Sequence, residues 1–338
     1  MTDRIVMSLE EVDALVRHAL EANGASPVQA RAVARIVTMA ERDICESHGL
    51  FRVPGYVASL RSGKVDGKAV PVLSQPAPSV IAVDAKKGFA PLALETGLGP
   101  LADLAHETGV AALAVRRCHH FAALWPEVET LAEAGLVGLA VTAATPMVAP
   151  AGGTRPLYGT NPVAFAFPRD DQPPMAFDMA SAAMARGDIM IHAREAEPVP
   201  EGVGIGPDGA PTTDPAAVLA GAQLPFGGYK GAAIALMVEL LAGAVIGDLF
   251  SFEAGRGLKD GGPPEGGEFV LALDPARFGH GRDWVARAET LFAEIAAIEG
   301  TRLPGDRRIA NRAKTARDGI TAKAPLLAEI RSLAGEPT

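Results

Sequence analysis

Short apolar runs alternate with helical segments in the middle of this chain, and this alternation constrains the fold more than any other feature. Residues 80–83, 110–115 and 136–142 are apolar and of strand length, whereas residues 90–108 and 125–134 have helical character. Chains that alternate in this way form sheets covered by helices. We therefore predict an α/β fold with an α+β tendency.

The two ends of the chain are predicted to be helical. Ser8 and Glu11 have the spacing of a capping box, and Ser26 followed by Pro27 is typical of a second helix start. Further helical segments are expected in three places: after Pro54, over residues 285–299, and from Ala310 onward.

Composition and charge argue against several classes of protein. The formal net charge is -9 and no run of Lys and Arg stands out, which argues against a nucleic-acid partner. The two cysteines, Cys45 and Cys118, make no disulfide framework and fit a reducing, cytoplasmic compartment. The most apolar run, residues 231–247, carries Glu239 in its middle, so we expect a buried helix and no membrane span.

Gly204, Gly206 and Gly209 match the spacing of the dinucleotide-binding fingerprint. That fingerprint works only between a strand and a helix, where the helix N-terminus meets the pyrophosphate. Here the surrounding residues 198–221 are rich in glycine and proline and are expected to form a loop, as are residues 255–267. A nucleotide would have to be held by another kind of site.

Ser47, His48 and Arg52 follow a helix, where a loop can present side chains. His48 is suited to proton transfer near neutral pH, and Arg52 to a two-point contact with a carboxylate. Ser47 can hydrogen-bond a reacting group. Taken alone, these residues fit an ordinary loop histidine with a surface arginine better than a functional site.

Two adjacent histidines, His119 and His120, raise the question of a metal. Neighbouring residues on a strand point to opposite faces, so the pair is a poor metal site, and polar groups at a helix start suit phosphate better. Asp178 and Asp188 stand in mainly apolar stretches and need partners, for which a histidine is suitable. The alternatives are a helix cap for Asp178 and a surface charge for Asp188.

Three further segments combine turns with groups that bind anions. Gly227 and Gly228 lead into a helix start where Lys230 adds positive charge, and this combination favours phosphate. The turn of residues 303–308 carries two arginines, and Thr160 lies in an Asn-Pro turn. A charged surface turn explains residues 303–308 equally well.

In this order, these segments resemble the malate/L-lactate dehydrogenase type 2 family, over nearly the whole chain. The runs Ser47 to Tyr56 and His119 to Pro126 are most similar to the branch that reduces Δ1-piperideine-2-carboxylate and Δ1-pyrroline-2-carboxylate. The resemblance implies hydride transfer from NADPH to the C=N carbon of a small cyclic imino acid, giving L-pipecolate or L-proline. Tyr229 departs from the histidine typical of close relatives, so NADH stays open as the donor.

The resemblance also assigns roles to residues. Ser47, His48 and Asp188 match a catalytic proton relay, and Arg52 and Thr160 match contacts to the substrate carboxylate. The matching cofactor-binding positions are His120, Phe121, Ala122, Ala123, Leu124, Asp178, Met179, Ala180, Tyr229, Lys230, Gly231, Leu303, Pro304, Gly305, Asp306, Arg307 and Arg308. No metal ligand is implied.

The family's architecture is a non-Rossmann NAD(P)-binding sheet domain with helical N- and C-terminal segments, in a homodimer with the site near the subunit interface. Residues 1–73 with 305–338 would form the helical substrate and dimerisation region. Residues 74–304 would form the NAD(P)-binding region, including a small subdomain near residues 116–169.

Three alternatives stay open. The first is an L-2-hydroxy-acid dehydrogenase of the same family, in which His48 would protonate the nascent alkoxide. The second is a metal-dependent hydrolase that uses His119 and His120. The third is a non-catalytic ketimine- or nucleotide-binding protein.

Overall fold

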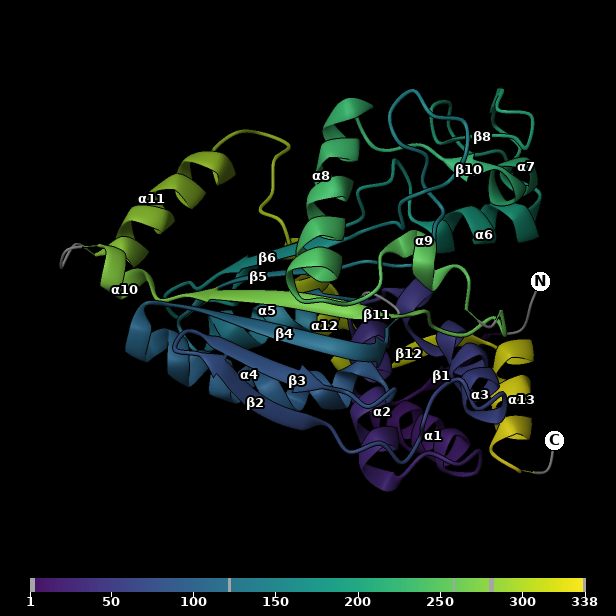
Figure 1. The fold of residues 1–338 in the computed structure, drawn as a ribbon, viewed down its shortest axis with the longest axis horizontal. Helices are drawn as coiled ribbons and strands as arrows, with labels where there is room; N and C mark the ends of the chain where they lie inside the picture. The colour runs from purple at the N-terminus through teal and green to yellow at the C-terminus, as the bar shows by residue number, and fades with distance from the viewer. Residues whose placement is uncertain (1–3, 121–122, 258, 280–282, 337–338) are drawn as a thin grey trace.

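A seven-stranded mixed sheet organises the molecule (Figure 1). The computed structural model describes residues 4–120, 123–257, 259–279 and 283–336. In spatial order the strands are β2 (Val72–Ala77), β3 (Val80–Asp84), β4 (Val110–His119), β11 (Glu265–Leu273), β5 (Val137–Thr142), β6 (Val163–Phe167) and β7 (Met175–Met179). Within this sheet β3 and β4 run parallel and every other neighbouring pair is antiparallel. The sheet confirms an α/β chain with an α+β tendency and is not the parallel sheet of a Rossmann fold.

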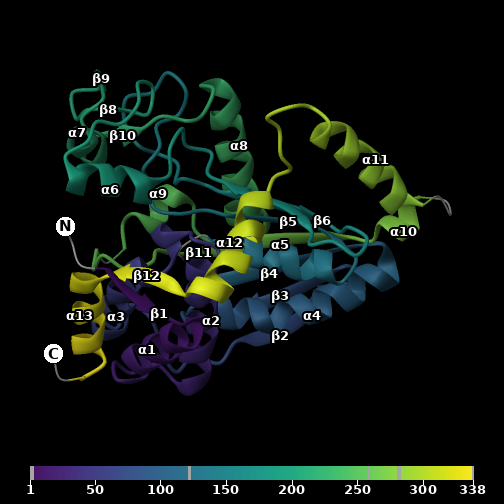
Figure 2. The same ribbon diagram turned by 180° about the vertical axis from the view of Figure 1, so that it is seen from behind.

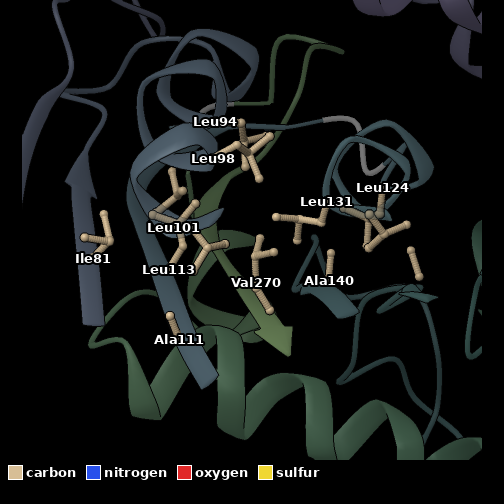
Figure 3. Packing of buried hydrophobic residues seen from close by; sticks show 14 of the residues in the cluster. Ile81, Leu94, Leu98, Leu101, Ala111, Leu113, Leu124, Leu131, Ala140 and Val270 are labelled. Carbon is tan, nitrogen blue, oxygen red and sulfur yellow. The ribbon is translucent and has the colours of Figure 1, made fainter. Parts of the chain in front are cut away.

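Helices pack on both faces of this sheet. On one face lie α4 (Ala90–Thr108) and α5 (Trp125–Glu133), and on the other lies α8 (Tyr229–Glu239). Figure 3 shows side chains of the main core: Leu94, Leu98 and Leu101 from α4, Leu131 from α5, and Leu113, Ala140 and Val270 from the sheet. This layering follows from the alternation in the sequence, because each helix buries one apolar stripe against the strands around it.

The two ends of the chain form a second region. Its elements are β1 (Arg4–Met7), α1 (Leu9–Glu21), α2 (Pro27–Arg42), α3 (Val53–Arg61), β12 (Ile320–Lys323) and α13 (Ala324–Leu333). Strands β1 and β12 pair antiparallel, which ties the first residues of the chain to the last (Figure 2). The Ser8–Glu11 capping box is confirmed: Ser8 Oγ accepts from Glu11 N at 3.1 Å, and Ser8 N donates to Glu11 Oε2 at 2.7 Å.

An ion network joins this region to the main sheet. Arg312, on α12 (Asp306–Asp318), donates to both oxygens of Asp43 at 2.8 and 2.7 Å and to Glu129 of α5 at 2.7 Å. Arg308 reaches the other oxygen of Glu129 at 3.2 Å. Burial raises the pKa of Asp43, but hydrogen bonds from Arg312 and Arg42 outweigh it and hold that pKa below its ordinary value.

The expected loop over residues 198–221 is wrong in part. Three short strands, β8 (Gly204–Ile205), β9 (Pro211–Thr212) and β10 (Ala222–Gln223), form a separate small sheet beside α6 (Arg186–Glu195) and α7 (Pro215–Ala220). The Gly204–Gly209 run makes β8 and the turn to β9, where Gly209 has φ +80°. It has the geometry of a hairpin, with no helix opening from it.

Two further expectations need correction. Strand β11, the central strand of the main sheet, was not expected, because Gly266, Gly267 and Glu268 at its start hide its alternation. The apolar run 231–247 is not a buried helix throughout. It forms most of α8 and a π-helical turn, Leu240–Val245, and it exposes Leu236, Leu240 and Val245.

The remaining helices are short or peripheral. They are two 3-10 turns, Glu46–His48 and Leu50–Arg52, with α9 (Ser251–Ala254), α10 (Pro275–Phe278) and α11 (Trp284–Ala296). The expected helix over residues 285–299 is therefore confirmed as α11, and the tail contains β12 between its two helices. In the part of the chain that the structure describes, no helix combines the length and hydropathy needed to span a bilayer.

Strands β5 and β6 lie within residues 116–169, for which the family suggests a small subdomain, and both belong to the main sheet. One core cluster gathers side chains from both termini, and another gathers those between the main sheet and α4 and α5. The domain boundaries stay a prediction.

Candidate functional site

A cleft of about 990 Å³ lies where the N-terminal region, the main sheet and α6 meet. Ten of the side chains expected at the site line it: Ser47, His48, Arg52, His120, Thr160, Asp178, Ala180, Asp188, Arg307 and Arg308. These residues come from segments more than 250 positions apart in the sequence. The fold therefore gathers both the expected proton-handling groups and most of the expected anion-binding groups around one space.

Ser47 and His48 form a pair at the cleft wall. They lie in the first 3-10 turn, with Ser47 Oγ 3.2 Å from His48 Nδ1. The His48 ring meets the edge of Trp125 at a centroid distance of 6.4 Å. Burial, together with the nearby Arg52 and His120, lowers the pKa of His48 to about 3. At neutral pH His48 is thus an uncharged imidazole that can take a proton at one nitrogen while releasing one from the other.

The turn after His48 depends on Gly49 and Glu41. Glu41 lies at the end of α2, and its Oε1 accepts from Leu50 N at 2.7 Å. A Cβ on residue 49 would force that carboxylate to move, so glycine here permits the close approach of Glu41. Burial raises the pKa of Glu41 to about 7.

Arg52 is fixed from within its own segment. Its Nε donates to the backbone oxygen of Ser47 at 2.6 Å, and its guanidinium lies 5.5 Å from the Phe51 ring centre. Burial lowers the pKa of Arg52, but an arginine stays charged. This arrangement presents a planar cation beside the Ser47–His48 pair.

Asp188 lies in the first turn of α6 and lines the cleft. Helix α6 packs closely on Ser47, because a Cβ on Gly187 would come within 2.7 Å of Ser47 Cβ. Burial raises the pKa of Asp188, and the nearby His192 opposes this shift. Among the described residues no hydrogen bond joins Asp188 to Ser47 or His48, so any relay through all three needs a bridging group.

Asp178 has a structural role that the sequence offered only as an alternative. Its Oδ2 accepts from Leu124 N at 2.8 Å and Trp125 N at 3.2 Å, at the start of α5. Helix α5 has no cap from its own N-cap side chain, so Asp178 supplies the missing acceptor from β7. Burial raises the pKa of Asp178 to about 6. The expected phosphate-binding donors at this helix start are therefore already occupied.

The segments expected to bind cofactor converge around β7. Arg308 Nη2 donates to Ala176 O at 3.1 Å, and a Cβ on Gly305 would meet the same oxygen at 2.9 Å. Just beyond β7, Ser181 O accepts from Phe226 N at 3.0 Å, which places the start of α8 beside residues 179–183. The Ser181 backbone N and Oγ both donate to Thr160 O, at 2.8 and 2.9 Å.

Some expected cofactor residues do not line the cleft. These are Ala123, Leu124, Met179, Tyr229, Lys230, Gly231, Leu303, Pro304, Gly305 and Asp306. Ala123, Leu124 and Leu303 are buried, whereas Tyr229 and Lys230 are exposed at the start of α8. Phe121 and Ala122 lie outside the described residues. Roles for all of them stay predictions.

The cleft also contains charged residues that the sequence did not single out. Lys64 Nζ and Asp260 Oδ1 form an ion pair of 2.9 Å, and Arg186 and Lys259 line the same space. With Arg52, Arg307 and Arg308, they give the cleft six basic side chains, and its volume is that of a ligand pocket. The residues present therefore fit an anionic cofactor together with a carboxylate substrate. No sequence signal would have found the pairing of Lys64 with Asp260, because the two residues lie in separate loops 196 positions apart.

The two adjacent histidines have different surroundings, as expected for a strand end. His119 Nδ1 lies 3.4 Å from Pro263 O, whereas His120 Nε2 lies 2.9 Å from Glu268 Oε2. The side chains of His120, Glu127 and Glu268 bring one potential metal-binding atom each within 4.8 Å of one another. Burial and the neighbouring Glu268 raise the pKa of Glu127 well above its ordinary value.

Comparisons with known proteins agree with this architecture. Residues 7–331 match the family model described as malate/L-lactate dehydrogenase. The chain is 51% identical over 337 residues to a Δ1-pyrroline-2-carboxylate reductase of Ancylobacter novellus, covering 98% of each chain. It is 47% identical to a Δ1-pyrroline-2-carboxylate/Δ1-piperideine-2-carboxylate reductase of Pseudomonas aeruginosa, covering 97% of this chain and 99% of the relative.

A solved structure is also similar. The crystal structure of Δ1-piperideine-2-carboxylate reductase from Pseudomonas syringae pv. tomato superposes with a TM-score of 0.93 at 42% identity, covering 97% of this chain and 99% of that one. The match extends over both the terminal region and the main sheet, so it includes every wall of the cleft. The chain belongs to the malate/L-lactate dehydrogenase family.

Proposed function

We propose that this protein is an NADPH-dependent reductase of small cyclic imino acids, converting Δ1-pyrroline-2-carboxylate to L-proline and Δ1-piperideine-2-carboxylate to L-pipecolate. The observation that carries the proposal is the Ser47–His48 pair beside the fixed guanidinium of Arg52, in a cleft that is rich in basic side chains. The relatives named as reductases of these imines support the choice of substrate.

The chemistry of a ring imine suits this cleft. The cofactor supplies a hydride to the C=N carbon of the protonated ring; the C=N π electrons move to nitrogen, and the products are the oxidised cofactor and a cyclic amino acid. The protein therefore has to hold the carboxylate, align the ring and keep its nitrogen protonated. Arg52 holds the carboxylate. Ser47 and the uncharged His48 keep the ring nitrogen protonated, because an imidazole without charge passes a proton without repelling a cationic substrate.

A 2-oxo acid makes a different demand. Its reduction creates an alkoxide that needs an acid at the moment of hydride transfer. With a pKa of about 3, His48 does not carry that proton at neutral pH. This comparison favours the imine over the hydroxy-acid alternative.

NADPH is the proposed donor because the cleft wall includes Arg307, exposed in the first turn of α12, where its guanidinium suits a 2′-phosphate. The exposed apolar side chains Leu236, Leu240 and Val245 on one side of the molecule support a homodimer, since such groups commonly mark an interface. A cytoplasmic location and a role in proline metabolism complete the proposal.

The test compares kcat/KM for cyclic imines and 2-oxo acids, and the decrease in NADPH absorbance measures each rate. We expect kcat/KM for either cyclic imine to exceed that for pyruvate and oxaloacetate by about tenfold to a hundredfold, which corresponds to one unpaired polar group. A higher value for a 2-oxo acid would instead assign the protein as a hydroxy-acid dehydrogenase. Intact NADPH binding with no turnover of any of the four would indicate a non-catalytic binding protein.

A further inference from the structure

His120, Glu127 and Glu268 meet beneath the wall of the cleft. They come from three elements: the residue after β4, the first turn of α5, and the start of β11. Glu127 is 3% exposed and Glu268 is fully buried, and the side chain of His120 is 10% exposed. Of the three, His120 reaches the cleft.

Among the described residues, both carboxylates have oxygens that lack hydrogen-bond partners, and the imidazole of His120 is the group that lies beside Glu268. Glu127 Oε2 and both oxygens of Glu268 are buried without a hydrogen-bond partner in the described part of the chain. Buried carboxylates in proteins are paired, protonated or coordinated to a metal ion. A shared proton or a bound cation would each satisfy these side chains, and the presence of an imidazole beside them favours a metal ion.

We propose that His120, Glu127 and Glu268 bind one divalent transition-metal ion of the Zn²⁺ or Mn²⁺ class. One imidazole nitrogen and two carboxylate oxygens form a ligand set that suits such ions. The three potential ligand atoms lie within 4.8 Å of one another.

The spacing of His120 and Glu268 supports a metal ion. Although His120 Nε2 and Glu268 Oε2 are 2.9 Å apart, Glu268 makes no hydrogen bond of acceptable geometry. Two atoms at that separation subtend about 90° at an ion roughly 2.0–2.1 Å from each. His119 takes no part, because its ring is directed to Pro263 O. The proposed site uses His120 without His119. It is therefore not the site of two adjacent histidines that the sequence argued against.

The ion would cross-link the three elements that surround it. Because His120 immediately precedes the chain that leads into α5, the ion would fix one end of the segment expected to contact the cofactor. Its effect should therefore be seen in metal content and thermal stability, independently of which substrate the enzyme reduces.

The first experiment measures metal in the wild-type protein. Protein without a histidine tag is purified without chelators and analysed by inductively coupled plasma mass spectrometry. We expect about one ion per chain, since all three ligands come from one subunit. Chelator treatment should lower Tm, and titrating Zn²⁺ or Mn²⁺ back should restore it in a saturable way.

Two isosteric variants test the ligands. Glu127→Gln and Glu268→Gln should abolish stoichiometric metal and lower Tm. Glu133→Gln, an exposed position on the same helix as Glu127, should change neither. If the two carboxylates only share a proton, Glu127→Gln and Glu268→Gln should raise Tm instead of lowering it, because each removes one of two buried like charges.

The proposal is overturned if wild-type protein contains no stoichiometric metal and its Tm responds neither to chelator nor to added Zn²⁺ or Mn²⁺. These measurements need no variant, so a substitution that prevents folding does not weaken them.

Discussion

His48 combines a position at the cleft with an environment that keeps it uncharged. Its Nδ1 faces Ser47 Oγ at 3.2 Å, its ring contacts Trp125, and Arg52 stands nearby. A histidine in the open loop that the sequence suggested would titrate near pH 6.5. Burial changes its role from a charged acid to a neutral carrier of protons.

Replacing this ring gives the first prediction. We expect His48→Ala to lower turnover of the imine by about 10² to 10⁴, because the positioned proton carrier is lost. NADPH affinity, measured by fluorescence titration, should stay close to wild type, since Arg307 and Arg308, which are proposed to contact the cofactor, are untouched. Turnover within about threefold of wild type, well below that range, would remove His48 from the mechanism.

At the scale of single elements, short junctions between helices position the site. Glu41 at the end of α2 fixes the turn that carries Ser47 and His48, and the start of α12 places Arg307 at the cleft and Arg308 against β7. Each junction leads to a prediction about one side chain, Glu41 in the first and Arg307 in the second.

Glu41 makes this junction sensitive to pH. Its pKa rises from 4.5 to about 7 on folding, so the unfolded chain releases this proton first as pH increases. The stability from this group is fully present below pH 4.5 and is lost as pH rises through about 7. The difference of 2.5 units corresponds to about 3 kcal/mol above pH 7, to order of magnitude.

Glu41→Gln keeps an acceptor for Leu50 N and removes the ionisation. We expect it to raise the free energy of unfolding in urea at pH 8 and to leave it nearly unchanged at pH 4.5. Glu10→Gln, an exposed change on α1, is the control and should have no such pH dependence. Equal stability of Glu41→Gln and wild type at pH 8 would contradict the assigned burial cost.

The two adjacent arginines at the start of α12 have different surroundings. Arg308 is held by Glu129 and Ala176 O and lies over the Trp125 ring, whereas Arg307 is exposed at the cleft. We expect Arg307→Ala to lower the preference for NADPH over NADH, because an exposed guanidinium matches a 2′-phosphate. The ratio of the two kcat/KM values measures it, and an unchanged ratio would place the contact elsewhere, with Lys230 next to be tested.

The sequence predicted helices better than strands. Helices α1 and α2 have capping residues and apolar spacing that identify them locally. Strands β1 and β11 depend on partners far along the chain, and Glu268 and two glycines interrupt the pattern of β11. Ser47, His48 and Arg52 could be predicted as a site because they lie close together in the sequence, as do the capping residues of a helix. The Lys64–Asp260 pair and the Glu127–Glu268 contact could not, because each forms only when distant loops and strands meet.

At the scale of the whole molecule, buried charges hold the terminal region to the main sheet. Arg312 stands between Asp43, which is fully buried as a side chain, and Glu129. Removing Arg312 would leave Asp43 with Arg42 and Glu129 with Arg308, so the two buried carboxylates would share fewer cations.

We expect Arg312→Ala to lower the free energy of unfolding by about 1.5–3 kcal/mol, because its hydrogen bonds to two buried carboxylates are lost while Arg42 and Arg308 still pair them. Arg317→Ala on the same helix breaks an exposed pair with Asp318 and should cost less than about 1 kcal/mol. Chemical denaturation of both variants gives the comparison. Similar losses for the two would show that the network contributes nothing beyond a surface ion pair.

The pairing of β1 with β12 has a consequence for synthesis on the ribosome. Residues 4–7 cannot find their partner until residues 320–323 have been translated. At about 5–20 residues per second, that interval is roughly 15–60 s. During it, α1 and α2 have emerged but their apolar faces lack α13, which completes the same core. The apolar faces of the nascent N-terminal helices are therefore available for chaperone binding until β12 and α13 have been translated and complete the core.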